Sequence, residues 1–173
     1  INTLIPALMA GNSVILKHAA QTLVVGERFA KAFDMAGLPK DLFQNLVMSH
    51  GQTEKLLASG RVDHCNFTGS VAGGRAIEKA AAGTFMTLGL ELGGKSPAVI
   101  CPSGSMTKAV KSIAYGKFVN AGQTCIAPDY VMVPRERLVE FAEQVLAEAR
   151  RAYPEVGADY SSMISDRSFD RMT

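Results

Sequence analysis

The sequence is poor in cysteine and histidine, with three of each among 173 residues. Cys65, Cys101 and Cys125 form no CxxC pair, which argues against a disulfide framework and favours a reducing compartment. We therefore expect a cytoplasmic protein. The histidines stand at no spacing that, together with an acid, would hold a metal ion, so we expect no metal site.

Long apolar runs and a strong excess of one charge are also absent. Apolar stretches such as residues 4–10 are far shorter than the ~20 residues that cross a bilayer, and no signal-peptide pattern is present. The net charge is +2, and the basic residues are scattered along the chain. We expect neither a nucleic-acid partner nor a membrane partner. The chain opens at Ile1 rather than Met, so these patterns say little about targeting.

Apolar residues make up 47% of the chain, enough for a sizeable core, and they fall into alternating strand and helix patterns. Predicted strands cover residues 13–16, 43–48, 62–67, 85–92, 98–101 and 130–133. Predicted helices cover residues 25–36, 52–58, 71–82, 106–119 and 137–153. Strands separated by helices at this spacing predict βαβ units, and therefore an α/β fold with a mainly parallel sheet. The turn at Gly93 and Gly94 is the best candidate for a domain boundary.

Cys125 is a candidate nucleophile because it follows a loop of small and polar residues, residues 121–124, and not an apolar strand. A thiol has an ordinary pKa of ~8.5, so it reacts well at neutral pH only if a base or a dipole assists it. No histidine lies near Cys125 in the sequence, which argues against an acyltransferase with a Cys–His pair. The alternative is a small side chain buried in the core, the role we expect for Cys65 and Cys101.

Glu91 is a candidate base because it stands near the end of a mostly apolar segment, between Leu90 and Leu92. We expect a partly desolvated carboxylate at a strand end, where desolvation would raise its pKa and make it a stronger base. Ligands in open α/β sheets also gather at the carboxyl ends of strands. A solvated charge at the end of a strand is the alternative.

Residues 69–74 form a glycine-containing segment between a predicted strand and a predicted helix. Helix N-termini present unpaired N–H groups, and glycine lets a phosphate approach the backbone. The segment is not a GxGxxG motif, and many such turns contain glycine for steric reasons alone. Lys17 directly follows the first predicted strand, at the same sheet edge, where it could reach a ribose or phosphate, or remain a solvated surface side chain.

Together these segments resemble the aldehyde dehydrogenase superfamily over essentially the whole chain. Residues 118–125, FVNAGQTC, resemble the nucleophile signature of that family, and residues 90–97, LELGGKSP, resemble its glutamate signature. The two signatures stand in the order of the family, with thirty-four positions from Glu91 to Cys125.

Two further segments resemble the cofactor motifs of the same superfamily. Residues 67–70, followed by Gly74, resemble its cofactor turn. Residues 6–8 and residues 11–17 resemble the strand whose lysine contacts the adenosine ribose. Four motifs in register are a much more specific indication than any one of them.

The resemblance implies a Rossmann-like cofactor domain, of which residues 1–91 would be part, followed by part of an α/β catalytic domain over residues 92–173. The thiolate of Cys125 would attack an aldehyde, hydride would pass to NAD or NADP, and Glu91 would activate the water that hydrolyses the resulting thioester. The cofactor would be bound by Lys17, Gly69, Ser70, Gly74 and the backbone of Leu92.

The resemblance also implies that the chain is the middle portion of a longer, homo-oligomeric enzyme. The asparagine that completes the oxyanion site in the family would lie upstream, and the acid that positions the nicotinamide ribose would lie downstream. The main alternative is a truncated, catalytically incompetent segment that acts only as a structural or interaction piece.

Two departures from the family pattern bear on specificity. Ala20 stands where the family often has an acid that binds the ribose hydroxyls, so a 2′-phosphate would not be repelled and NADP would be tolerated. Residues 125–130, CIAPDY, resemble the branch that acts on fatty and aromatic aldehydes, including the coniferyl aldehyde dehydrogenases.

Overall fold

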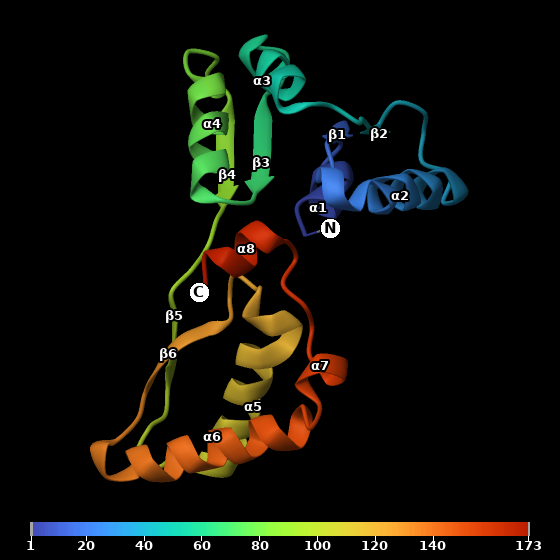
Figure 1. Ribbon diagram of the computed structural model, residues 1–173. Helices are drawn as coiled ribbons and strands as arrows, with labels where there is room; N and C mark the ends of the chain where they lie inside the picture. The colour runs from blue at the N-terminus through green and yellow to red at the C-terminus, as the bar shows by residue number, and fades with distance from the viewer. Residues whose placement is uncertain (1, 173) are drawn as a thin grey trace. The chain divides into compact units, whose positions relative to one another are not determined.

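The structure, a computed structural model, describes residues 2–172 of the chain. The chain divides into two compact units, Ile1–Glu91 and Leu92–Thr173 (Figure 1). The strands are β1 (Val14–Leu16), β2 (Phe43–Asn45), β3 (His64–Thr68), β4 (Thr87–Glu91), β5 (Ser96–Val99) and β6 (Pro128–Met132). The α-helices are α1 (Leu4–Met9), α2 (Leu23–Met35), α3 (His50–Ala58), α4 (Val71–Ala81), α5 (Met106–Phe118), α6 (Leu138–Ala152), α7 (Val156–Asp159) and α8 (Asp166–Asp170). The 3-10 helices are η1 (Ala20–Thr22), η2 (Val119–Gly122) and η3 (Arg135–Arg137).

Every strand pair is parallel, which confirms the predicted α/β class. β1 pairs with β2, β3 with β4, and β5 with β6. A long helix connects the two strands of each pair: α2, α4 and α5 respectively. Within residues 2–172 the strands form three two-stranded sheets, not one continuous sheet. Each pair is therefore one βαβ unit of the kind that the sequence pattern predicts.

In β3 the half-buried and exposed side chains alternate along the strand. Cys65 and Phe67 are half-buried, while His64, Asn66 and Thr68 are exposed, as the alternation along the strand predicts. Burial raises the pKa of the Cys65 thiol. The apolar face of β3 lies toward α4, because the Phe67 ring lies close to the backbone of that helix.

Serine N-caps mark the starts of three of the helices that follow strands, α3, α4 and α5. The Ser70 hydroxyl accepts a hydrogen bond from the Gly73 N–H at the start of α4, and Ser105 does the same for Lys108 in α5. At the start of α3, Ser49 forms a capping box with Gln52.

The core of the second unit lies where the β5–β6 pair meets α5 and α6. Ile100, Met106 and Val110 are buried, and Phe141 and Val145 of α6 pack against them. Figure 1 shows α5 and α6 as the long helices of this unit. The amphipathic pattern that predicts residues 137–153 as a helix therefore also places its apolar side against this core.

The N-terminal end of α6 is held by an ion pair and a backbone contact. The Arg137 guanidinium forms a 3.0 Å ion pair with Glu140 and donates a 3.1 Å hydrogen bond to the Gly104 carbonyl. The hydrogen bond from Arg137 lowers the pKa of the Glu140 carboxyl.

The prediction that Cys101 packs in the core is wrong. β5 ends at Val99, and Ile100 makes the last hydrogen bond to β6, donating to the Met132 carbonyl at 2.9 Å. The chain then turns, with the Gly104 N–H bonded to the Cys101 carbonyl at 2.8 Å, and the Cys101 side chain is exposed. The short apolar run thus ends one residue before Cys101.

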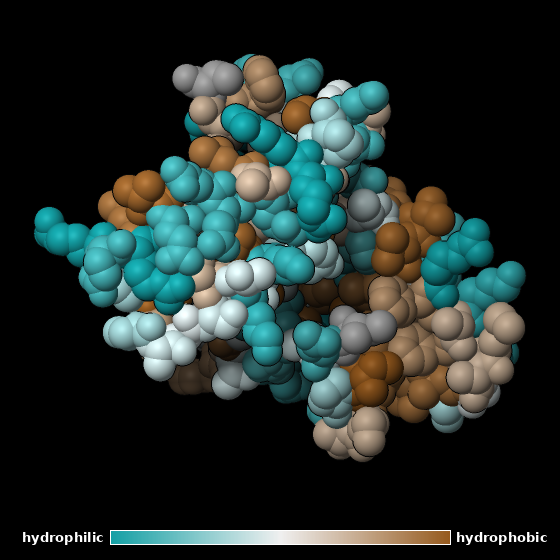
Figure 2. Space-filling model, turned by 90° about the horizontal axis from the view of Figure 1, so that it is seen from below, coloured by the Kyte–Doolittle hydropathy of each residue, from teal (hydrophilic) through white to brown (hydrophobic). Residues whose placement is uncertain are grey.

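Large hydrophobic side chains remain at the surface in both units. Met9 and Phe85 in the first unit are 83% and 101% exposed, and Ile126 in the second is 75% exposed. Figure 2 shows hydrophobic side chains among polar ones on the face that it draws. None of the helices within residues 2–172 combines the length and the hydrophobicity that a membrane span requires.

Candidate active site

The glycine-containing turn between β3 and α4 is tied to the end of β4. The Gly69 N–H donates a 3.0 Å hydrogen bond to the Glu91 carbonyl, and Thr68 stands opposite Glu91 in the parallel register. The candidate cofactor turn and the candidate base therefore lie at the same carboxyl edge of one strand pair. This is the edge at which ligands gather in parallel sheets.

The Phe67 ring gives a steric reason for glycine at two positions near this turn. A Cβ atom at Gly69 would lie 2.5 Å from the tip of the Phe67 ring, and one at Gly73 would lie 2.6 Å from it. Real Cβ atoms do not approach so closely, so the ring fits only because both positions lack a side chain. Gly74 is buried, and its N–H donates to the Ser70 carbonyl at 2.9 Å.

The start of α4 nevertheless presents free donors. The Ser70 hydroxyl satisfies the Gly73 N–H. The N–H groups of Ser70, Val71 and Ala72 have no hydrogen-bond partner in the part of the chain that the structure describes. Three adjacent donors at the positive end of an eleven-residue helix fit a phosphate group.

Glu91 lies at the last position of β4, as predicted, but its carboxylate is exposed. The expected partial desolvation is therefore not observed, because the mostly apolar run before Glu91 does not cover the strand end. Leu92, the next residue, is half-buried and begins the second unit.

Lys17 directly follows β1 and is half-buried, so it is not a fully solvated surface side chain. Its strand pair, β1–β2, is separate from β3–β4 within residues 2–172, so a shared sheet edge with the glycine turn stays a prediction. His18 lies next to it, and its Nδ1 atom forms a 3.0 Å hydrogen bond with the Thr22 hydroxyl.

Cys125 lies at the tip of a turn, and its side chain is exposed. The Ala127 N–H donates to the Thr124 carbonyl at 3.0 Å, which places Cys125 and Ile126 at the two central positions of the turn. The alternative of a buried structural cysteine is therefore wrong. The Cys125 N–H has no hydrogen-bond partner among residues 2–172, so it remains available to an oxygen atom of a ligand.

Gly94, in the part of the glutamate signature that belongs to the second unit, lies against this thiol turn. A Cβ atom at Gly94 would lie 2.6 Å from the carbonyl oxygen of Cys125, so only glycine lets the two backbones approach this closely. One residue further, the Lys95 ammonium forms a 3.2 Å ion pair with Asp129. The segment after Glu91 thus lies directly beside the segment that carries Cys125.

The backbone before Cys125 is strained. Asn120 and Ala121 have φ values of 53° and 54°, and Gly122 follows with 71°. Left-handed conformations cost free energy for residues other than glycine and are concentrated at functional sites. Gln123 follows them and forms long-range hydrogen bonds with its side chain. The sequence pattern did not single out Gln123, because its partners are about forty residues away.

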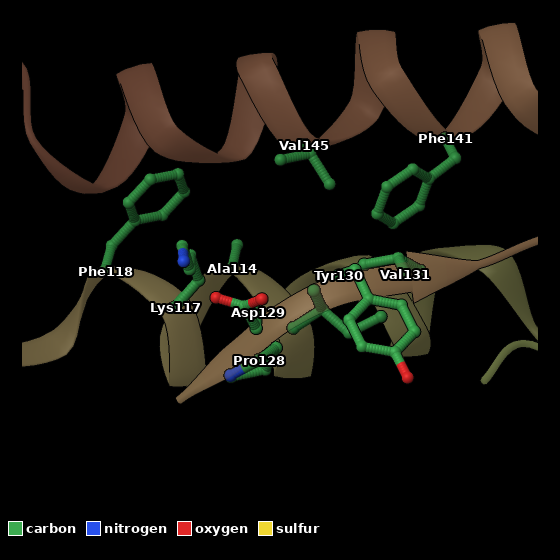
Figure 3. A pocket seen from close by; sticks show the side chains of 10 residues that line it. Ala114, Lys117, Phe118, Pro128, Asp129, Tyr130, Val131, Phe141 and Val145 are labelled. Atoms are coloured by element: carbon green, nitrogen blue, oxygen red, sulfur yellow. The ribbon is translucent and has the colours of Figure 1, made fainter. Parts of the chain in front are cut away.

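An apolar groove of about 290 Å³ lies in the second unit, between α5, α6 and β6. Figure 3 shows Phe141 and Val145 pointing from α6 toward the strand residues that form the opposite wall. None of the candidate site residues lines this groove. Nor do three or more His, Cys, Asp or Glu side chains gather into a possible metal site in residues 2–172.

The three parallel βαβ units define an α/β protein, with a glycine turn at one strand edge and an exposed thiol on a tight turn. The profile of the aldehyde dehydrogenase family matches residues 1–173, and the chain belongs to this family. Its fold is that of aldehyde dehydrogenases of known structure.

Curated relatives and solved structures agree with this assignment. The chain is 37% identical to a probable coniferyl aldehyde dehydrogenase of Pseudomonas aeruginosa over 99% of its own length and 36% of the relative. It is 35% identical to the dimeric NADP-preferring aldehyde dehydrogenase of Rattus norvegicus, covering 99% of the chain and 38% of that protein. The chain therefore spans little more than a third of the length of these relatives.

Among solved structures, aldehyde dehydrogenase C of Pseudomonas syringae, in complex with NAD+ and octanal, superposes with a TM-score of 0.86 at 29% identity, over 97% of this chain and 36% of that one. Lactaldehyde dehydrogenase of Escherichia coli superposes with a TM-score of 0.85 at 28% identity, over the same shares.

Proposed function

We propose that the chain supplies the nucleophile, the general base and part of the cofactor site of an NAD(P)-dependent aldehyde dehydrogenase. The observation that carries the proposal is the exposed Cys125 turn packed against Gly94. Glu91 precedes Gly94 by three residues, and three residues of chain span at most ~11 Å. The length of the chain alone therefore keeps the Cα atom of Glu91 within about 11 Å of the Cα atom of Gly94.

In this mechanism the Cys125 thiolate adds to the aldehyde carbonyl carbon, and the carbonyl electron pair moves onto oxygen. The unpaired Cys125 N–H donates to that oxygen, and the family resemblance adds an asparagine from outside the chain as a second donor. When bound, NAD(P) supplies the acceptor for the hydride that leaves the thiohemiacetal carbon. The acyl group then remains on Cys125 as a thioester.

Glu91 takes the proton from the water that attacks this thioester. The C–S bond breaks, the carboxylic acid leaves, and Cys125 returns as the thiolate. An exposed carboxylate suits this role because it can exchange its proton with solvent between turnovers. Glu91 also accepts the proton of the thiol when Cys125 enters the reaction as the neutral form.

We assign the cofactor phosphates to the free N–H groups at the start of α4, beside Gly69, Ser70 and Gly74. The family resemblance assigns Lys17 to the adenosine ribose and the Leu92 backbone to the nicotinamide amide. We therefore expect residues 1–91 to act as part of the cofactor domain and residues 92–173 as part of the catalytic domain.

We expect the enzyme to accept NADP, because Ala20 offers no carboxylate to repel a 2′-phosphate. His18 has its Nδ1 bonded to the Thr22 hydroxyl. Its Nε2 can donate toward such a phosphate when it carries the proton. The relative from Rattus norvegicus is described as NADP-preferring. Ala20→Glu should lower kcat/KM for NADP at least tenfold while keeping that for NAD, and an overwhelming NAD preference of the unaltered enzyme would contradict the assignment.

We propose fatty and aromatic aldehydes as the substrate class, from the CIAPDY segment and the relatives described as coniferyl aldehyde dehydrogenases. We further propose that the intact enzyme is a homo-oligomer, since the NADP-preferring relatives are described as dimeric. A cytoplasmic location would keep its free thiols reduced.

The test uses the full-length protein with a panel of aldehydes and NAD(P)H formation as the readout. Cys125→Ala should abolish turnover, whereas Cys101→Ala, which removes the other exposed thiol of the same unit, should leave it unchanged. Glu91→Gln should give a burst of about one NAD(P)H per site and then stop, because hydrolysis of the thioester is blocked. Unchanged turnover in Cys125→Ala would contradict the mechanism.

The alternative role as a structural piece is tested by the same assay on the 173-residue chain. If both polypeptides fold normally but only the full-length protein turns over aldehyde, the isolated 173-residue chain is catalytically incompetent and acts as a structural piece.

A further inference from the structure

The side chain of Gln123 joins the thiol turn to a distant segment of the second unit. Its Nε2 atom donates to the Ser162 carbonyl at 3.1 Å, and its Oε1 atom accepts from the Ile164 N–H at 2.9 Å. The amide therefore pairs with the backbone groups on either side of Met163, in the way that a peptide group of a neighbouring strand would. Both ends of the half-buried amide are used.

The same residue also closes the strained backbone that precedes Cys125. Its Nε2 atom donates to the Asn120 carbonyl at 3.0 Å, and its N–H donates to the same oxygen at 3.1 Å. In return the Asn120 side chain donates to the Gln123 carbonyl at 3.3 Å. A tight turn across Gln123 follows, with the Thr124 N–H bonded to the Gly122 carbonyl at 2.9 Å.

The distant segment leads directly into a short helix. Ser165 follows it directly and caps α8, because its hydroxyl accepts a hydrogen bond from the Ser168 N–H. Gln123 thus connects the segment before α8 with the strained loop. Cys125 lies two residues beyond Gln123, at the end of that connection.

We propose that Gln123 is a positioning residue that sets the approach of the Cys125 thiolate to the substrate by holding its turn against residues 162–164. This inference rests on the proposed function, in which Cys125 attacks an aldehyde. A reacting group displaced by about 1 Å loses on the order of 10²-fold in rate. The amide is required because it donates to two carbonyl groups and accepts from one N–H, a combination that a carboxylate cannot provide.

The experiment compares three variants of the full-length protein with the unaltered enzyme. Gln123→Ala should lower kcat on the order of 10²-fold with KM for the cofactor within twofold, since the cofactor turn lies in the other unit. Hydrogen exchange at the Ile164 N–H should become fast in the same variant. Gln144→Ala is the matched control and should keep kcat within twofold, because within residues 2–172 this amide bonds only to Glu140 on α6.

Gln123→Glu supplies a signature that general loss of structure would not produce. As a carboxylate it faces the carbonyl oxygens of Asn120 and Ser162, so kcat at pH 8 should fall at least as far as in Gln123→Ala. As a protonated acid it can donate to one of them. Its kcat relative to the unaltered enzyme should therefore rise as pH falls from 8 toward 5.5.

The outcomes separate two failures. One result would overturn the positioning role alone: Cys125→Ala abolishes turnover, but the kcat of Gln123→Ala stays within threefold of that of the unaltered enzyme. A flat relative pH profile for Gln123→Glu, or an equal loss in Gln144→Ala, would overturn it as well. Turnover that survives Cys125→Ala would instead overturn the proposed function and with it the role of Gln123 in that reaction.

Discussion

Gly94→Ala should damage the thiol turn without touching any group that takes part in the chemistry. The new methyl carbon would lie 2.6 Å from the Cys125 carbonyl oxygen, a backbone atom that cannot rotate away. An ordinary contact begins near 3.4 Å, so one of the two backbones must move by about 0.8 Å. A shift of about that size costs on the order of 10²-fold in rate when it displaces a reacting group. Overpacking of this kind also costs ~1–3 kcal/mol of stability.

The assay is kcat for aldehyde oxidation by the full-length protein, with the rate of Cys125 alkylation by iodoacetamide as a second readout. Gly157→Ala is the matched control, because a Cβ atom at Gly157 in α7 would meet nothing within 4 Å. We expect a loss of about 10²-fold for Gly94→Ala and no change for Gly157→Ala. If Gly94→Ala kept kcat within threefold, the close approach of the two backbones would not control the thiol.

Three further predictions follow from local geometry. Ala121→Gly should raise the free energy of unfolding by ~0.5–1 kcal/mol in urea titrations, because glycine removes the cost of φ 54° and loses only part of that gain as entropy. Gly73→Ala should lower the free energy of unfolding by ~1–3 kcal/mol, because the new methyl group overlaps the Phe67 ring. Gly51→Ala in α3 is the control: its methyl group meets nothing within 4 Å, so it should raise the free energy of unfolding by ~0.5–1 kcal/mol. Equal effects of the two substitutions would refute the overlap. Because burial raises the pKa of Cys65, peptide mapping should find that its thiol alkylates at higher pH in the folded protein than in the urea-unfolded protein. The free energy of unfolding should fall as pH rises above the pKa of the unfolded thiol, because only the unfolded thiol ionises readily there.

The sequence predicted the long elements well, because their patterns are local. The helix expected over residues 106–119 is Met106–Phe118, and the one expected over residues 71–82 is Val71–Ala81. Both begin at a serine cap and carry a helical apolar period. The expected burial of Cys65 in the core is met only in part, because its side chain in β3 is half-buried.

What the sequence could not supply depends on contacts between distant residues. The short helices α1, α7 and α8 lack a long apolar period, so no pattern predicted them. The exposure of Glu91 and of Cys101 depends on where strand pairing stops, which their own neighbours in the sequence do not specify. The contact of Gly94 with Cys125 and the hydrogen bonds of Gln123 join residues thirty-one and about forty positions apart.

The sparse interior has a practical consequence for work with the 173-residue polypeptide. Two-stranded sheets have little stability unless helices pack on them. Within residues 2–172, the buried hydrophobic side chains of the second unit are those of Ile100, Met106, Val110 and Ala114. With side chains such as Phe85 and Met9 fully or largely open to water, the isolated polypeptide should self-associate as its concentration rises. Light scattering over a dilution series should accompany every stability measurement, because an unfolding midpoint that depends on concentration would report aggregation as well as folding.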